Sequence, residues 1–151
     1  LGYSFYIKSV ECRLSVHSTS YEKLKSRLRE LTGRSNGMGY ERRKTALRLF
    51  LMGWLEYFKL ADMKSKLQVL DEWYRRRLRM CIWKNWKKVK TRFKNLMRCG
   101  IDKSKAWEWA NTRKGYWRIS NSWILGRALN TDILRQANYP FLMDCYRKVV
   151  S

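Results

Sequence analysis

"TALRLFLMGWLEYFKL", residues 45–60, carries the most regular apolar pattern in the chain. Its large apolar side chains recur three and four residues apart, the spacing of one helix face: Leu47, Phe50, Leu51, Trp54, Leu55 and Phe58. The segment "TGRSNGMG", residues 32–39, precedes it, and its three glycines and one asparagine are typical of a loop. We therefore predict a helix from about Tyr40 to Leu60 that buries a broad apolar face.

Helical spacing also occurs on both sides of this segment. From Ser18, which is a suitable N-cap, three leucines share one face: Leu24, Leu28 and Leu31. After Asp62 a third stripe occurs: Leu67, Leu70, Tyr74, Leu78, Cys81 and Ile82. Three helices with short connections predict a bundle.

Residues 1–16 have the alternating pattern of strands, with apolar side chains at every second position in two runs. A turn at Lys8 and Ser9 would pair residues 7/10, 5/12, 3/14 and 1/16 and would place the apolar side chains on one face. An isolated hairpin is marginally stable in water. This hairpin therefore either packs on the helices of this chain or ends a larger domain.

Short helices are predicted after Gly100, with caps at Asp102 or Ser104, at Asn121 or Ser122, and at Thr131, and with Pro140 in the first turn of the last helix. The predicted fold is mainly α: an N-terminal β-hairpin, a three-helix bundle and a cluster of short C-terminal helices.

The composition is strongly basic, with 34 Lys and Arg against 12 Asp and Glu and a formal charge of +22. A charge of about 2 to 8 suffices for the solubility of a small domain, so this chain needs a polyanion or an anionic surface as partner. No run of 18 apolar residues and no signal peptide occurs. Four cysteines without a CxxC pair and the single His17 argue against a zinc site and favour a reducing, cytoplasmic setting.

The charge is densest in "RRRLRMCIWKNWKKVKTRFK", residues 75–94, since residues 73–101 hold eleven Lys and Arg and no acid. On a helix of 100° per residue, Tyr74 and Leu78 lie on one side, whereas Trp83 and Trp86 lie among the basic residues on the other. The two rings either pack against the tryptophan-rich helices later in the chain or are displayed for stacking.

Such a surface could face solvent, a membrane or a nucleic acid. A solvated helix face normally mixes both signs of charge, which this stretch does not. A membrane surface suits Lys, Arg and Trp, but the apolar side of this helix is narrow and is needed by neighbouring helices. Binding to a nucleic acid explains both the basic residues and the tryptophans, because cations neutralise phosphates and aromatic planes stack on bases. Charge alone does not separate RNA from DNA.

The candidate phosphate-binding residues are Arg75, Arg76, Arg77, Arg79, Lys84, Lys87, Lys88, Lys90 and Arg92, with Arg113, Lys114 and Arg118 as a second patch. The candidate stacking residues are Trp83, Trp86 and Trp117. The acids are scattered, and we read Asp71 and Glu72 as ordinary surface, so we predict no catalytic or metal-binding residues in this chain.

Three blocks resemble one family. "RSNGMGYERRKTALRLFLMGWLEYFKLAD" (34–62) is similar to the maturase-specific domain, or domain X, of group II intron-encoded reverse transcriptases, with "MGWLEYF" as its signature. "LDEWYRRRLRMCIWKNWKKVKTRFKNL" (70–96) and "ANTRKGYWRISNSWILGRAL" (110–129) resemble the segments C-terminal to that signature in bacterial members. "LGYSF" resembles the last conserved segment of the palm of these enzymes.

The resemblance implies three parts: the end of a palm-like domain (1–17), a thumb (18–82) and a basic, Trp-rich helical DNA-binding region (83–151). The implied partners are intron RNA, an RNA/DNA template-primer duplex and target DNA, in RNA splicing and intron mobility within the bacterial cytoplasm, at the nucleoid when bound to DNA. The implied cofactor is Mg²⁺ in the palm alone, and none is expected in this chain.

In an alternative interpretation, this chain is part of an active RNA-directed DNA polymerase whose palm lies upstream. A less favoured interpretation is a basic membrane-surface protein. Two departures limit the resemblance. The chain lacks the ligand clusters of the HNH-type endonuclease found in many relatives, and Met52 stands where the family usually has Arg before "GW".

Overall fold

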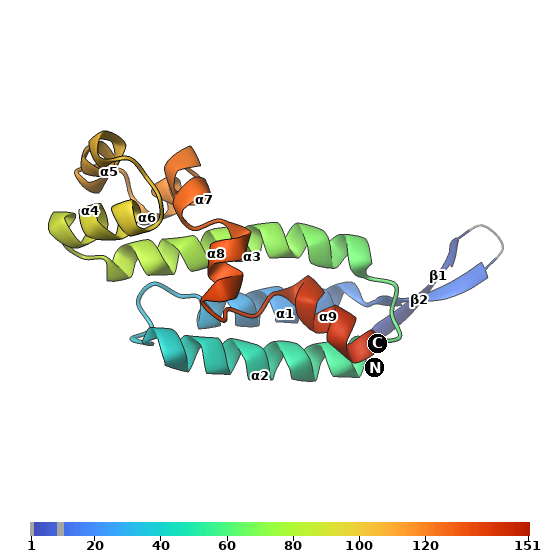
Figure 1. Cartoon of the computed structure of the whole chain (residues 1–151). Coiled ribbons are helices and arrows are strands. Elements are labelled where there is room, and N and C mark those ends of the chain that lie inside the picture. Colours follow the sequence, from blue (N-terminus) through green and yellow to red (C-terminus); the bar gives the residue numbers. More distant parts are fainter. Residues whose placement is uncertain (1, 9–10) are drawn as a thin grey trace. The chain divides into compact units, whose positions relative to one another are not determined.

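Figure 1 shows the computed structural model of the chain, which describes residues 2–8 and 11–151, with only the backbone described for 7, 8 and 11–13. Two strands come first, β1 (Tyr3–Lys8) and β2 (Glu11–Val16). Nine helices come after them in the described residues: α1 (Ser18–Leu31), α2 (Tyr40–Phe58), α3 (Lys64–Asn85), α4 (Val89–Arg98), α5 (Lys103–Ala110), α6 (Tyr116–Ile119), α7 (Trp123–Ala128), α8 (Thr131–Gln136) and α9 (Leu142–Val150). The predicted mainly α fold with an N-terminal hairpin is confirmed.

The chain forms two compact units, and the division falls within α3. The first unit comprises the described part of Leu1–Leu31, together with Asn36–Trp73 and Tyr139–Ser151. The second unit comprises Thr32–Ser35 and Tyr74–Asn138. The functional division at residues 17 and 82 stays a prediction.

The predicted apolar face of α2 forms the centre of the first unit. Leu47, Leu51 and Leu55 are completely buried, and Phe58 is nearly so. Trp54 is half-buried and its ring packs against that of Phe58 in a tilted arrangement, with 4.5 Å between the ring centroids. The same face begins with a charged residue, Arg43, which is 3% exposed. Its guanidinium donates to the Leu31 carbonyl (3.1 Å) and to the Asn36 side-chain oxygen (3.0 Å), so it joins the end of α1 to the start of α2.

The hairpin register differs from the prediction by two residues. Tyr3 pairs with Val16 and Phe5 with Leu14, where residues 3/14 and 5/12 were predicted. A shift of two residues keeps every side chain on its face, because the side-chain period of a strand is two. The apolar face is therefore as predicted although the pairing was wrong. Leu1, Ser9 and Val10, and with them the pairs 1/16 and 7/10, lie outside the described residues.

The hairpin packs on the helices of its own unit. The Tyr3 ring lies 5.2 Å from that of Phe58, and its hydroxyl donates to the Tyr57 carbonyl. The backbone N–H of Asp62 donates to the Leu14 carbonyl at 2.8 Å, and the Tyr6 hydroxyl donates to the Asp62 carboxylate. Of the two alternatives that the sequence left open, packing on this chain's helices is therefore observed.

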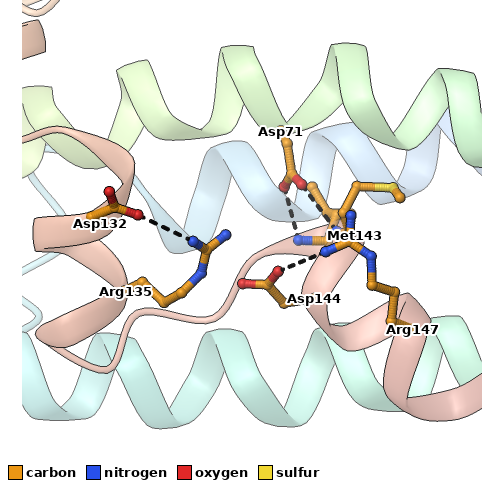
Figure 2. A network of polar contacts seen from close by, with 7 residues as sticks. Asp71, Asp132, Arg135, Met143, Asp144 and Arg147 are labelled. Atoms are coloured by element: carbon orange, nitrogen blue, oxygen red, sulfur yellow. Dashed lines mark hydrogen bonds and ion pairs between the residues drawn. The ribbon is translucent and has the colours of Figure 1, made fainter.

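Asp71 holds the C-terminal helix in the first unit, and its prediction as ordinary surface was wrong. Its side chain is buried (4% exposed), and its two oxygens accept hydrogen bonds from the backbone N–H groups of Leu142 (2.8 Å) and Met143 (2.9 Å) (Figure 2). These are first-turn amides of α9, which have no acceptor inside the helix. The N-cap is Phe141, so Pro140 precedes the helix and does not occupy its first turn as predicted.

The second unit consists of the later part of α3 and of α4 to α8, with α4 packed on α5. Helix α4 ends at Arg98 and its C-cap is Cys99; the next residue is Gly100, whose φ of 89° suits glycine. The side chain of Ser122 caps α7, as one of the two predicted alternatives. The side chain of Asn130 caps α8, one residue before the predicted Thr131.

Candidate nucleic-acid interface

The positive charge is concentrated in the second unit. That unit holds 19 Lys and Arg against three acids (Asp102, Glu108 and Asp132), a formal charge of +16. The first unit holds the other 15 basic residues and nine acids, which is the remaining +6 of the total. The second unit is therefore the part of the chain with the strongest attraction for a polyanion.

Several of the predicted phosphate-binding arginines are engaged inside the second unit. The Arg76 guanidinium donates to the Ser120 hydroxyl (3.1 Å) and to the Trp117 carbonyl (2.8 Å). The Arg79 guanidinium donates to the Leu129 carbonyl at 2.9 Å. Burial lowers the pKa of Arg79, and the neighbouring charge of Arg75 lowers this pKa further. These guanidinium groups attach α3 to α6 and to the end of α7.

A second group of α3 side chains holds the segment 32–35. Arg77 donates to the hydroxyl and to the carbonyl of Thr32, at 3.1 and 3.2 Å, and the Cys81 thiol donates to the same carbonyl. Lys84 donates to the carbonyl of Arg34 and lies 3.5 Å from the Ser35 hydroxyl. Arg77 and Lys84 are thus half-buried and hold this loop by hydrogen bonds, so only part of their surface is accessible to a ligand.

Trp83 and Trp86 are packed. Trp83 has no exposed surface and Trp86 is 8% exposed, with 5.9 Å between their ring centroids. The Arg92 guanidinium lies 4.5 Å from the centroid of the Trp83 ring and donates to the Trp86 carbonyl at 2.7 Å. Neither ring offers a face to a base in this structure, so of the two alternatives that the sequence left open for them, packing is observed. Helix α3 ends at Asn85, which places Trp86 beyond the helix on which its direction was predicted.

The remaining predicted cations lie on the surface. Lys87 and Lys88 lie in the connection from α3 to α4, and Lys90 lies in the first turn of α4. All three are exposed, and we call them the lysine cluster. The second predicted patch is exposed as well: Arg113, Lys114 and Arg118. Arg75 is half-exposed. The side chains of the lysine cluster have no hydrogen bond or ion pair to any residue that the structure describes, so their charges are available to an external anion.

Trp117 is 36% exposed, and one side of its ring is covered by the Arg76 guanidinium, 3.7 Å from the ring centroid. Two more exposed tryptophans, which were not among the predicted stacking residues, belong to the same unit: Trp107 (56%) and Trp123 (54%). The sequence feature that could have identified them is the high density of Trp among Lys and Arg in residues 103–123. The helical segments there are too short for their periodicity to show which side chains are exposed.

Neither a metal site nor a membrane span is found in the part of the chain that the structure describes. No group of three or more His, Cys, Asp and Glu side chains there is arranged to hold a metal ion. None of the described helices combines the length and the apolar character needed to cross a bilayer.

Comparison with known proteins agrees with the resemblance in the sequence. No curated protein matches the chain. The sequence model of the family described as "Group II intron, maturase-specific domain" matches residues 21–100, which run from α1 to the end of α4 and include the lysine cluster. Since the match covers more than half of the 151 residues, this chain belongs to the group II intron maturase family, through its maturase-specific domain.

Proposed function

We propose that this chain binds the phosphate backbone of group II intron RNA through the lysine cluster, Lys87, Lys88 and Lys90. The observation that carries the proposal is the exposure of three neighbouring lysines that have no partner among the described residues, in a unit of charge +16. The cluster also lies within the residues that match the maturase family.

The electrostatics of α4 support an anion at this position. The helix begins at Val89, and its N-cap Lys88 makes no side-chain capping hydrogen bond. No acid lies in the first turn. The free N–H groups and the positive end of the helix dipole therefore add to the lysine charges.

The arginines of α3 have a complementary role in this proposal. Because Arg76, Arg77 and Arg79 are hydrogen-bonded within the second unit, they stabilise its fold, while the exposed lysines contact the ligand. Binding releases the cations condensed on the RNA, which makes the affinity salt-dependent. A folded intron brings phosphates close together, and neutralising them in this way would favour the folded RNA and assist its splicing.

The test reverses the three charges in a Lys87→Glu, Lys88→Glu, Lys90→Glu variant. A matched control makes the same charge change at three exposed lysines of the first unit: Lys23, Lys64 and Lys148. Each lost phosphate contact reduces the magnitude of the slope of log K against log salt by about 0.7 to 0.9. The slope of the cluster variant is therefore expected to be smaller than that of the wild type by about 2 to 3.

The measurement is filter binding to structured intron RNA over a range of salt concentrations, with circular dichroism to show that both variants are folded. The control is expected to keep more of the affinity and more of the salt slope than the cluster variant. An equal loss in both variants, or no loss in the cluster variant, would reject the lysine cluster as the binding surface.

A further inference from the structure

The second unit displays an aromatic and basic group that the proposed function leaves unused. Trp123, the first residue of α7, is 54% exposed although it is among the largest apolar side chains. Its ring meets that of Trp109 edge to face, with the centroids 6.0 Å apart and an interplanar angle of 87°. The edge-to-face contact fixes the orientation of the Trp123 ring while much of its surface stays open to solvent.

One cation lies against this tryptophan pair, and two further basic residues lie close to it in the sequence. The Lys114 ammonium lies 4.8 Å from the centroid of the Trp109 ring. Arg127 is exposed and lies four residues after Trp123 on α7, which places it on the same side of the helix. Arg113 is exposed next to Lys114 in the connection from α5 to α6. An open indole, with one cation on its partner ring and exposed basic residues nearby in the chain, suits a ligand with flat rings joined by anions.

We infer that Trp123 is a stacking platform for an unpaired base, with Lys114 and Arg127 contacting the flanking phosphates. The inference rests on the proposed function, because it takes the bound polymer to be a nucleic acid. The inference goes further by naming the ligand class as an unpaired nucleotide. A base within a duplex is already stacked on both faces and cannot lie on an exposed indole without unpairing. The shared chemistry is an unpaired nucleotide of either RNA or DNA.

The magnitude of the effect comes from stacking. A base stacked on an aromatic side chain contributes about 1 to 3 kcal/mol by alanine substitution, which is roughly a 5- to 150-fold change in the dissociation constant. Because the stacking energy depends little on base identity, Trp123→Ala is expected to weaken binding to unpaired strands of different sequence by similar factors. Duplex binding is expected to change little.

The experiment uses 2-aminopurine, whose fluorescence falls when the base stacks, in a short single strand and in the matching duplex, each as RNA and as DNA. The wild-type protein is expected to quench the single strand, and Trp123→Ala to lose the quenching and the affinity. Trp123→Tyr keeps an aromatic plane and is expected to restore most of both. Trp107→Ala removes an equally exposed tryptophan, whose ring neighbour is Phe93, and is the matched control.

The outcomes separate this inference from the proposed function. Loss of quenching in Trp123→Ala with either strand, and not in Trp107→Ala, supports the platform, and the more strongly affected strand identifies the ligand. If Trp123→Ala quenches the fluorescence normally while the lysine-cluster variant loses affinity for RNA, the stacking role of Trp123 is rejected and the proposed function stands. Binding to anionic phosphatidylserine vesicles that depends on Trp123, with unchanged quenching, would assign the group to lipid and also reject the inference.

Discussion

Replacement of Asp71 by alanine tests the attachment of α9 to the first unit. The change removes both acceptors of the hydrogen bonds from the backbone N–H groups of Leu142 and Met143, at 2.8 and 2.9 Å. A hydrogen bond to a charged group contributes about 1.5 to 3 kcal/mol, and loss of a helix cap costs about 0.5 to 2 kcal/mol. Water that reaches the freed amides offsets part of this, so we expect a loss of about 2 to 4 kcal/mol of unfolding free energy.

Two variants give this prediction its controls. Asp71→Asn retains one side-chain oxygen as acceptor and is expected to lose about half as much stability. Glu72→Ala removes a neighbouring carboxylate that is exposed, and is expected to change the unfolding free energy by less than about 0.5 kcal/mol.

Urea denaturation monitored by circular dichroism measures the loss, and the thiol of Cys145 provides a local readout. Cys145 is buried in α9, so a thiol reagent should reach it faster when the helix is detached. Equal stability of Asp71→Ala and Glu72→Ala, with equal Cys145 reactivity, would refute the role assigned to Asp71.

Three further predictions concern stability and pH. Arg79→Gln shortens the side chain and leaves the Leu129 carbonyl unpaired, so we expect it to lose about 1 to 3 kcal/mol in urea denaturation with little change in RNA affinity, unlike the exposed Arg113→Gln. Trp83→Ala removes a completely buried ring and is expected to destabilise the protein by about 3 to 5 kcal/mol, and a loss below about 1 kcal/mol would contradict its burial. Burial raises the pKa of the Cys145 thiol, so the thiol of the unfolded chain loses its proton at a lower pH than the native thiol. The free energy of unfolding is therefore unaffected by this group below about pH 8.5 and falls with rising pH, by at most about 1.4 kcal/mol per pH unit, until the native thiol ionises. Urea denaturation at several alkaline pH values should therefore show a smaller decline for Cys145→Ala than for the wild type.

Local sequence patterns predicted the helices well where one face dominates. Leu47, Leu51 and Leu55 recur at helical spacing because one side of α2 is buried along its whole length. The hairpin register was less determined, since neither Lys8 nor Ser9 is a strong turn former and two registers of the same parity give the same apolar face. The observed register is accompanied by contacts of Tyr3 with Phe58, which are not visible in the strand pattern.

Roles that depend on distant partners could not be read from the sequence. Asp71 was predicted as ordinary surface because the acids are scattered along the sequence, whereas the amides that it binds lie about 70 residues later in the chain. Trp83 was placed among the cations by a correct helical wheel, but that side of α3 is covered within the second unit, and Arg92 lies over the ring. A wheel gives the direction of a side chain and not the groups that it meets.

Residue chemistry explains how the basic stretch divides between structure and surface. The guanidinium of Arg has five donors in a plane, so it can bind a carbonyl and cover an aromatic ring at once, as Arg76 does with Trp117 and Arg92 with Trp86 and Trp83. The ammonium of Lys is a strongly hydrated point charge that favours solvent. Three of the four lysines between residues 84 and 90 are exposed without a partner among the described residues, and Lys84 is the exception, since it reaches the Arg34 carbonyl. A basic stretch that mixes both residues can therefore hold its own fold with arginine and still present lysine to a polyanion.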